Sequence, residues 1–560
     1  FSATPSPREP HVGVLLPPPP ALLVSASCAM LRRAPQCVRT AGPCKGSRAL
    51  GLGPVYEDGS PAYVRSEPPR AVVVNRVQSL ALNKRLVAMT GSEEILKLVK
   101  LQSAKFSDVN LATALYRLGK LQKKSADGKA VNMYDARLEK LTAIVAKRIY
   151  DGDGVWAPRE LANVSWGISH LEKIPSKKYV YEGVAGLAAD KANDFNSHDI
   201  TNTVLAFSKA KMFAPRMFSE LSKAALVKIT TFRSQELANV VLAYSKINFP
   251  APALFDAVAV AVPQKLEFFA TFELANLAWA FARSGGGGGG GGKFPKTPEI
   301  FAAIEPEAIR KIREFKPYEL ANILWAYAKA RVPAPELFRL AEMEAIRKMH
   351  LFNPQCIGNT TWAFASAGLC APALFSAAEK QAVLKIDEFH SQETSNTLWA
   401  FAKAGIPAPD LFEARAKGMP VLAAALNSQQ VANIAWAYSK QGNQDTRVFI
   451  ALAPEIMKRA QAFNAQELAN AAWALAKARL VSPCRPLLAF EALARESMKK
   501  TNQMNPQILA NIAWANASAD VLGKAEQVAL FEALGEESMK KMRLFNPQSL
   551  ANTVWAFASA

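Results

Sequence analysis

The chain has 560 residues, of which half are hydrophobic, and its formal net charge is +20 at neutral pH. This length exceeds what one compact core usually serves, and the charge favours an acidic polymer or an anionic surface as the partner. Six cysteines without a Cys-x-x-Cys pair and only five histidines argue against a zinc site or a disulfide framework, and no uncharged apolar run reaches the roughly 18 residues that a membrane span needs.

The first 74 residues are Pro-rich and carry no helical pattern, so we expect them to be disordered. From Met30 onward the segment holds basic residues and no acid before Glu57, which resembles an organelle transit peptide; a merely basic disordered tail is the alternative. The chain begins at Phe1 and stops at Ala560 directly after a repeated helix, so we expect a fragment truncated at its C-terminus.

Residues 75–150 have helical patterning and one degenerate copy of a motif that recurs later, LATALYRLGK, with Thr113 in the place of a motif asparagine. We expect this region to be the N-terminal capping region of the array that fills residues 151–560.

That array is visible when the segments are aligned on one asparagine. It stands at Asn163, Asn202, Asn239, Asn276, Asn322, Asn359, Asn396, Asn433, Asn470, Asn511 and Asn552. Most steps are 37 residues, and the longest, of 46, contains the homopolymer Gly285–Gly292, which we expect to be a flexible insertion. Two helical signals per period of about 37 predict an all-α fold, an α-solenoid of about twelve helix-turn-helix repeats.

Each repeat is predicted to hold a helix A followed by a helix B. Helix B opens with phrases such as FNPQ and FNAQ, in which Asn353, Asn464 and Asn546 suit the N-cap and Glu467 completes a capping box. After helix B, phrases such as VPAPELF at 332–338 place prolines that end one helix and begin the next helix A.

Three residues after the asparagine comes a tryptophan in most repeats, including Trp325, Trp362, Trp399, Trp436 and Trp473. A repeated core residue between repeats is a more economical interpretation than base stacking. The asparagines, including Asn239, Asn276, Asn322, Asn359, Asn396, Asn433 and Asn470, are identical in nearly every repeat and so cannot distinguish bases. Two roles are open for them. One is structural, in which the asparagine bonds to the neighbouring repeat's backbone or caps a turn; the other is a uniform contact to a nucleic-acid backbone.

Basic residues recur at two fixed positions. Seven residues after the asparagine stands what we name the helix-B basic column: Lys120, Lys209, Lys246, Arg283, Lys329, Lys403, Lys440 and Lys477, with His170, Ser366, Ser518 and Ser559 in the other repeats. Eleven residues before it stands the helix-A basic column: Lys191, Lys228, Lys265, Lys311, Lys348, Lys385, Arg459, Lys500 and Lys541. Either column could serve helix dipoles and solubility. Two columns in register favour a track for phosphates, and both are predicted to bind an RNA backbone.

Discrimination between bases would need a variable position. Twenty residues before the asparagine stands the helix-A variable column, with Ser219, Asp256, Arg339, Ser376 and Glu413 as candidate base-reading residues. Any exposed helix position varies in the same way.

The phrases NPQSLANTVWAFASA at 546–560, SQETSNTLWAFAKAG at 391–405 and AQELANAAWALAKAR at 465–479 resemble helix B of the octotricopeptide repeat family, over about 105–560. Similar arrays occur in FAST-kinase-like and RAP-domain proteins. The resemblance implies RNA binding in a mitochondrion or chloroplast, acting in transcript processing, stability or translation, or a place at an organelle ribosome. The family's Pro-Pro-Pro-Glu-Trp opening is replaced here by Ala-Pro-x-Leu-Phe, so its base code does not transfer.

We therefore expect a sequence-selective, single-stranded RNA-binding solenoid in an organelle, with organelle ribosomal or ribonucleoprotein proteins as further partners and no membrane span. The alternative is a scaffold that binds proteins. No phosphate-binding loop or catalytic constellation is evident, since the glycine run lacks the Lys-Ser/Thr that ends a P-loop. We expect no catalytic residues, no metal and no cofactor.

Overall fold

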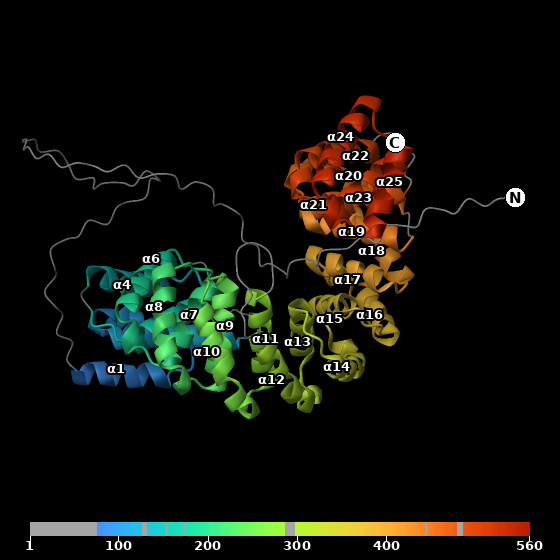
Figure 1. The fold of residues 1–560 in the computed structure, drawn as a ribbon. Coiled ribbons are helices and arrows are strands. Elements are labelled where there is room, and N and C mark those ends of the chain that lie inside the picture. Colours follow the sequence, from blue (N-terminus) through green and yellow to red (C-terminus); the bar gives the residue numbers. More distant parts are fainter. Residues whose placement is uncertain are drawn as a thin grey trace, which may run out of the picture. The chain divides into compact units, whose positions relative to one another are not determined.

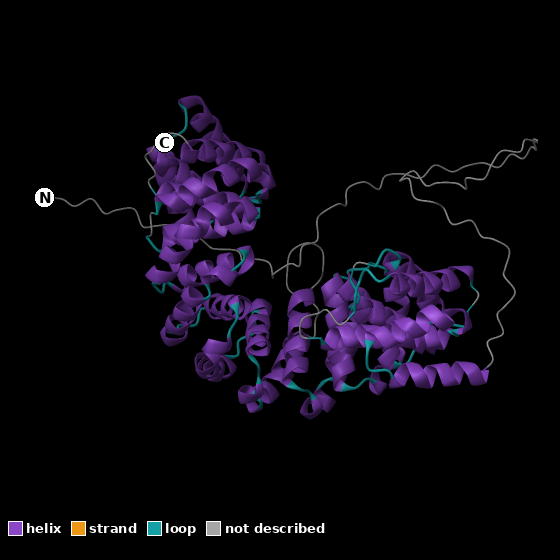
Figure 2. Cartoon of the chain, turned by 180° about the vertical axis from the view of Figure 1, so that it is seen from behind, coloured by secondary structure: helices purple, strands orange, loops and turns teal. Residues whose placement is uncertain are grey.

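The computed structural model describes residues 76–125, 131–152, 154–172, 174–285, 297–442, 445–478 and 485–560. The predicted disordered and transit-like segment lies outside these residues, as does the glycine insertion beyond Gly285. Within the described ranges every regular element is a helix (Figure 2). The all-α prediction is confirmed.

The chain forms two compact units that meet in the sequence between Phe232 and Arg233. The helices of the N-terminal unit are α1 (Arg76–Ala88), α2 (Ser92–Gln102), α3 (Asp108–Lys124), α4 (Ala136–Asp151), α5 (Pro158–Ser169), α6 (Lys177–Asp190), α7 (Ser197–Ala210) and α8 (Pro215–Val227). Odd-numbered helices from α3 onward are helices B, and even-numbered ones from α4 onward are helices A.

The C-terminal unit continues the alternation. Its helices are α9 (Ser234–Ile247), α10 (Pro252–Ala261), α11 (Thr271–Gly285), α12 (Thr297–Arg310), α13 (Pro317–Ala330), α14 (Pro335–Lys348), α15 (Pro354–Ala367), α16 (Pro372–Leu384), α17 (Ser391–Ala404), α18 (Pro409–Leu422), α19 (Ser428–Lys440), α20 (Thr446–Arg459), α21 (Ala465–Lys477), α22 (Arg485–Lys499), α23 (Pro506–Ala519), α24 (Lys524–Lys540) and α25 (Pro547–Ser559).

Helix B begins where the capping residues predict. Asn464 Oδ1 accepts a hydrogen bond from the Glu467 backbone N–H, and the Glu467 carboxylate accepts one from the Asn464 N–H, both at 2.9 Å. The side chains of Asn353 and Asn546 cap α15 and α25 by accepting from the backbone N–H groups of Cys356 and Ser549, and each is followed by a proline at the first helical position. These side chains satisfy backbone donors that a helix start leaves without partners.

Several B helices, among them α7, α9, α13, α15, α17 and α23, end at a residue in the left-handed conformation. After α13, Arg331 has φ 57°, and the Val332 N–H donates to the Tyr327 carbonyl at 3.1 Å. After α15 and α17 the same place is taken by Gly368 and Gly405, which reach φ near 70° without steric cost. The chain then turns through the predicted proline pair into the next helix A.

The two helix types form two rows. Within the C-terminal unit, α11, α13, α15 and α17 lie on the inner side of an arc whose outer side is made by α12, α14, α16 and α18 (Figure 1). Within each unit, helix B of one repeat packs along its length on helix B of the next, while consecutive helices A touch less extensively. This stacking is the predicted solenoid, in which each repeat buries its apolar face against a neighbour.

Helix A packs on one side of its helix B through a pair of aromatic rings. Phe301 of α12 and Tyr327 of α13 meet edge to face, with ring centroids 4.7 Å apart, and the Tyr327 hydroxyl donates to the Phe301 carbonyl at 2.7 Å. The pair Phe412 and Tyr438 repeats this arrangement at 4.8 Å and 2.8 Å. The ring five residues after the motif asparagine therefore marks the side of helix B that faces helix A.

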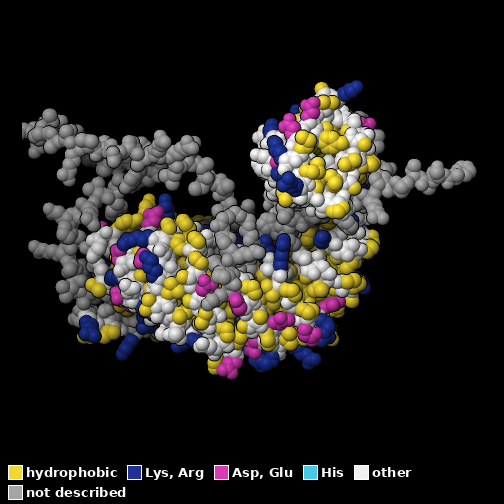
Figure 3. All heavy atoms as spheres, in the orientation of Figure 1, with side chains coloured by type: hydrophobic (Ala, Val, Ile, Leu, Met, Phe, Trp, Pro, Cys, Tyr) yellow, Lys and Arg dark blue, Asp and Glu magenta, His cyan; other side chains and the backbone are white. Residues whose placement is uncertain are grey.

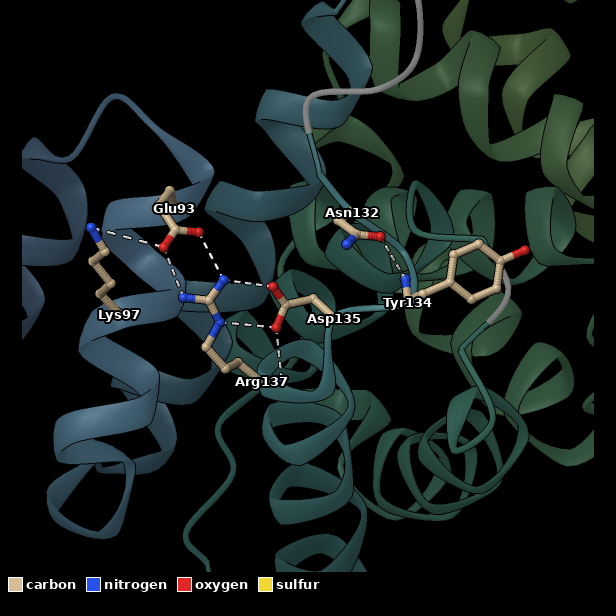
Figure 4. Close-up of polar contacts among 6 residues, drawn as sticks. All are labelled: Glu93, Lys97, Asn132, Tyr134, Asp135 and Arg137. Atoms are coloured by element: carbon tan, nitrogen blue, oxygen red, sulfur yellow. Dashed lines mark hydrogen bonds and ion pairs between the residues drawn. The ribbon is translucent and has the colours of Figure 1, made fainter.

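In the N-terminal unit, one arginine joins α2 to the start of α4 (Figure 4). Arg137 donates to both oxygens of Glu93, at 2.9 and 2.7 Å, and to both oxygens of Asp135, at 2.9 and 2.6 Å. Because the guanidinium hydrogen-bonds to them, the pKa values of the Glu93 and Asp135 carboxyls are lowered. Beside this network the Asn132 side chain accepts from the Tyr134 N–H at 3.0 Å.

Candidate nucleic-acid interface

Four positions of helix B share one face. In α13 they are Tyr318, Asn322, Trp325 and Lys329, which lie within about 60° of one another at 3.6 residues per turn. Tyr327, which contacts helix A, lies on the opposite side of the same helix. We name this face the helix-B stripe; it points away from the row of A helices.

The tryptophans of successive stripes stack into a ladder with two runs, one from Trp279 to Trp436 and one from Trp473 to Trp514. Ring centroids are 6.3 Å apart for Trp279 and Trp325, 6.0 Å for Trp325 and Trp362, and 6.4 Å for the pairs Trp362–Trp399, Trp399–Trp436 and Trp473–Trp514, with planes tilted by 30–33°. Trp325, Trp362, Trp399, Trp436 and Trp473 are buried, so the indoles belong to the packing between repeats. The ladder also fixes how closely adjacent stripes approach.

The asparagines beside the ladder are also buried. Asn322, Asn359, Asn396, Asn433 and Asn470 are at most 5% exposed, whereas Asn239 and Asn276 are half-buried. Where a partner is defined it comes from the same helix: Gln392 Nε2 donates to Asn396 Oδ1, and Gln466 Nε2 donates to Asn470 Oδ1, each at 2.9 Å. These two asparagines therefore bond within their own helix rather than to a neighbouring repeat's backbone.

The helix-B basic column lies at the C-terminal end of the stripe. Lys209, Lys246, Lys403 and Lys440 are exposed, and Arg283, Lys329 and Lys477 are half-buried. The Arg283 guanidinium lies over the Trp279 ring, 5.3 Å from its centroid, and the Lys477 ammonium lies 5.9 Å from the Trp473 ring. At these two tryptophans a cation thus lies against the indole ring.

The charges of this column are little compensated. Burial lowers the pKa values of Lys246 and Arg283, and burial together with the nearby cations Arg331 and Arg283 lowers the pKa of Lys329. In the part of the chain that the structure describes, Lys246, Lys329, Lys403 and Lys440 form no ion pair. Arg283 and Lys329, which are half-buried, have lost part of their hydration without gaining a carboxylate, so an added anion would compensate their charge.

The column is interrupted at defined repeats. Ser366 and Ser518 take the basic position in α15 and α23, and His170 takes it after α5. The His170 ring packs on Trp166 with centroids 4.2 Å apart, and burial, with the charges of Lys209, Lys123 and Lys177, lowers its pKa to about 4. His170 is therefore neutral at physiological pH.

The helix-A basic column has a different environment. Lys348 Nζ, at the end of α14, donates to the carbonyl oxygens of Arg313 and Phe315 in the preceding repeat, at 2.8 and 2.6 Å, and pairs with Glu344 at 2.5 Å. Its side chain is only 13% exposed. Lysine here acts as a clamp between repeats, with its ammonium donors already engaged.

The clamp recurs through both units. Carbonyl oxygens of the preceding repeat accept from Lys191, Lys228, Lys311, Lys385, Arg459, Lys500 and Lys541. Three members also form an ion pair with the acid four residues earlier: Lys311 with Glu307, Arg459 with Glu455, and Lys541 with Glu537. The column lies at the turn between helices A and B, so the two basic columns are at opposite ends of the B helices.

The helix-A variable column lies in the outer row. Arg339 is exposed and bonded to Glu336 at 2.6 Å, and Glu413 accepts from Arg447 of the next repeat at 2.8 Å. Ser376 is exposed, and Ser219 and Asp256 are half-buried. The structure does not bring these residues together with the helix-B basic column, because the B helices lie between them. Basic and acidic side chains lie next to one another on the surface over α12 and α14 (Figure 3).

Sequence reasoning missed one position of the stripe, four residues before the asparagine. From α7 to α25 it holds His198, Gln235, Phe272, Tyr318, Gln355, Gln392, Gln429, Gln466, Gln507 and Gln548, which we name the helix-B opening column. The signal was available, because this position precedes the basic residue by eleven residues, which is three helical turns, and so must share its face.

None of the helices in the described ranges is long and apolar enough to cross a membrane. The same ranges contain no cluster of three His, Cys, Asp or Glu side chains that could hold a metal ion.

Comparisons with known proteins match parts of the array. Residues 295–521 match the family model of RNA-editing substrate-binding complex 6 protein. A RAP domain-containing chloroplastic protein of Oryza sativa subsp. japonica is 24% identical over 160 residues, which are 27% of this chain and 25% of that protein, so the chain spans about a quarter of its length. A homology model of the AP-3 complex aligns with 87% of this chain and 93% of its own at 8% identity, but the TM-score of 0.26 supports no conclusion.

Proposed function

We propose that this chain binds single-stranded RNA along the helix-B stripe of its solenoid. The observation that carries the proposal is the helix-B basic column, in which Arg283 and Lys329 are half-buried on one face of their helices and burial lowers their pKa values. A phosphate brought against such a cation restores its pKa and replaces its lost hydration. The column supplies a cation in most repeats, at the regular spacing that a polymer with one charge per unit can match.

The helix-A basic column is not part of this interface. Its lysines donate hydrogen bonds to backbone carbonyls. The side chains of Lys311 and Lys348 are almost buried, at 11% and 13% exposed. A phosphate would have to displace these bonds and loosen the contact between repeats. The RNA backbone is therefore assigned to the helix-B column alone.

The relatives give this proposal its cellular setting. The matched family is named for an RNA-editing substrate-binding complex, and the rice relative is chloroplastic. We accordingly propose an organelle location, ribonucleoprotein partners and a non-enzymatic role in RNA processing, stability or translation. Selection among RNA sequences belongs to the same proposal.

The test is binding of the 560-residue chain to a random single-stranded RNA pool across a range of salt. Single-stranded binding weakens with a log-log slope of about −0.7 per phosphate contacted. The six basic residues of the column in the C-terminal unit, from Lys246 to Lys477, therefore predict a slope of about −4. A slope near zero, or equal binding of an acidic peptide, would favour the scaffold function instead.

A further inference from the structure

Two neighbouring repeats carry an aromatic residue in the helix-B opening column. Phe272 of α11 and Tyr318 of α13 each stand four residues before the motif asparagine of their helix. Their side chains are 38% and 50% exposed, although large aromatic rings usually lie in cores. Two exposed rings at one register position, in consecutive repeats, form a surface rather than a packing element.

These rings share the helix-B stripe with the cations. Phe272 and Arg283 lie on the same face of α11, and Tyr318 and Lys329 lie on the same face of α13, each pair three turns or about 16 Å apart along the helix. The stacking of Trp279 on Trp325 at 6.3 Å places the two stripes side by side. One face thus offers two rings at one end and two partly desolvated cations at the other.

The glutamines of the same column behave differently. Gln392 and Gln466 donate to the asparagine of their own helix, and Gln392 also accepts from Gln430 of the next repeat at 3.1 Å. An amide at this position is held against the stripe by hydrogen bonds. The ring carbons of Phe272 and Tyr318 have no amide group to donate to the asparagine, and both side chains are left partly exposed.

We propose that Phe272 and Tyr318 are a two-ring platform on which adjacent nucleobases of single-stranded RNA stack. The proposal rests on RNA binding by the stripe and adds the residues that contact the bases. Proteins that hold single strands combine aromatic rings with a cationic surface, because every base has a flat face that can stack on a ring. The absence of carboxylate partners at Lys329, among the described residues, favours a polyanion over a peptide as the occupant.

The experiment uses the full chain and a 12-nucleotide RNA in which 2-aminopurine replaces one base at a time, since its fluorescence is quenched by stacking. One or two positions should be quenched in the complex. Tyr318→Ala and Phe272→Ala should each relieve the quenching at one position and weaken binding by about 5-fold to 150-fold. The salt slope should stay unchanged, because no phosphate contact is removed.

Matched variants guard against unfolding as the cause. Tyr318→Phe and Phe272→Tyr keep a ring and should keep both affinity and quenching. Tyr179→Ala in α6 removes a ring of nearly equal exposure, 48%, that lies outside the stripe, and it should change nothing. If the wild-type chain binds RNA with the expected salt slope but the variant with both Phe272→Ala and Tyr318→Ala binds equally well, the two-ring platform is refuted and RNA binding by the stripe stands. If the wild-type chain binds no RNA, the proposed function falls with it.

Discussion

Lys348 Nζ donates a hydrogen bond to the carbonyl oxygen of Phe315, 33 residues earlier, at 2.6 Å. Phe315 lies in the turn before α13, whereas Lys348 ends α14, so this bond joins one repeat to the next. Under our proposal Lys348 does not bind phosphate. It can therefore be separated experimentally from Lys329, which belongs to the other basic column.

Replacing Lys348 with methionine should destabilise the array. The change leaves two carbonyl oxygens without their donor and leaves Glu344, 7% exposed, without its buried lysine partner. Hydrogen bonds to charged groups contribute about 1.5–3 kcal/mol each, so we expect a loss of that order in local stability. Hydrogen exchange in α13, α14 and α15 measures it, because a repeat array opens locally.

The control for this change is Lys417→Met in α18, whose side chain is 67% exposed and pairs loosely with Glu413 at 3.6 Å. It should leave exchange unchanged, since exposed ion pairs contribute little. Equal exchange in the Lys348 variant and the wild type would contradict the clamp.

Replacing Lys329 with methionine should weaken RNA binding while leaving the fold intact. One phosphate contact is lost, so the log-log salt slope should become shallower by about 0.7. Filter binding at several salt concentrations measures it. In the same assay the Lys348→Met variant should keep the wild-type slope wherever it remains folded. An unchanged slope for Lys329→Met and a shallower slope for Lys348→Met would show that the helix-A basic column, rather than the helix-B basic column, binds phosphates.

Filling the gap in the column should strengthen RNA binding. Ser366→Lys adds a cation between Lys329 and Lys403, at a position whose hydroxyl has no hydrogen-bond partner among the described residues. The slope should steepen by about 0.7. Ser376→Lys is the matched control, because it adds the same charge to the exposed side of α16, in the outer row of helices. If both variants gain equally, net charge rather than the column governs binding.

The His170 ring should stay neutral down to about pH 4, the value to which burial and neighbouring lysines lower its pKa. In the unfolded chain a histidine titrates near pH 6.5. The unfolded state therefore binds the proton first, and the stability of the N-terminal unit should fall as the pH falls from about 6.5 towards 4. Proton NMR of the ring and urea unfolding at several pH values test this; a ring that titrates near 6.5 would exclude the buried placement.

Removing one indole from the ladder should be costly. Trp399→Ala leaves a cavity between Trp362 and Trp436, each 6.4 Å from it, and large aromatic deletions cost about 3–5 kcal/mol. Urea unfolding should show the loss, whereas Val421→Ala, at an 86% exposed side chain, should show almost none. A small effect of the Trp399 change would mean that the ladder is not a structural element.

The sequence by itself determined the repeat, its period and the ends of its helices, because caps, prolines and apolar spacing act over a few neighbouring residues. Asn464 with Glu467, and Pro354 at the start of α15, were read correctly from local chemistry alone. The aromatic and alanine positions of helix B likewise indicated a packed array.

Only the tertiary structure decided what each column faces. Lys329 and Lys348 are equally basic and equally regular in the sequence, yet one lies over the stripe with its charge little compensated and the other bonds to carbonyl oxygens 33 and 35 residues earlier. Those acceptors are backbone atoms, which leave no trace in the residue pattern. The separation of Arg339 from Lys329 by a layer of B helices, and the exposure of Tyr318 beside buried Asn322, likewise depend on how repeats stack.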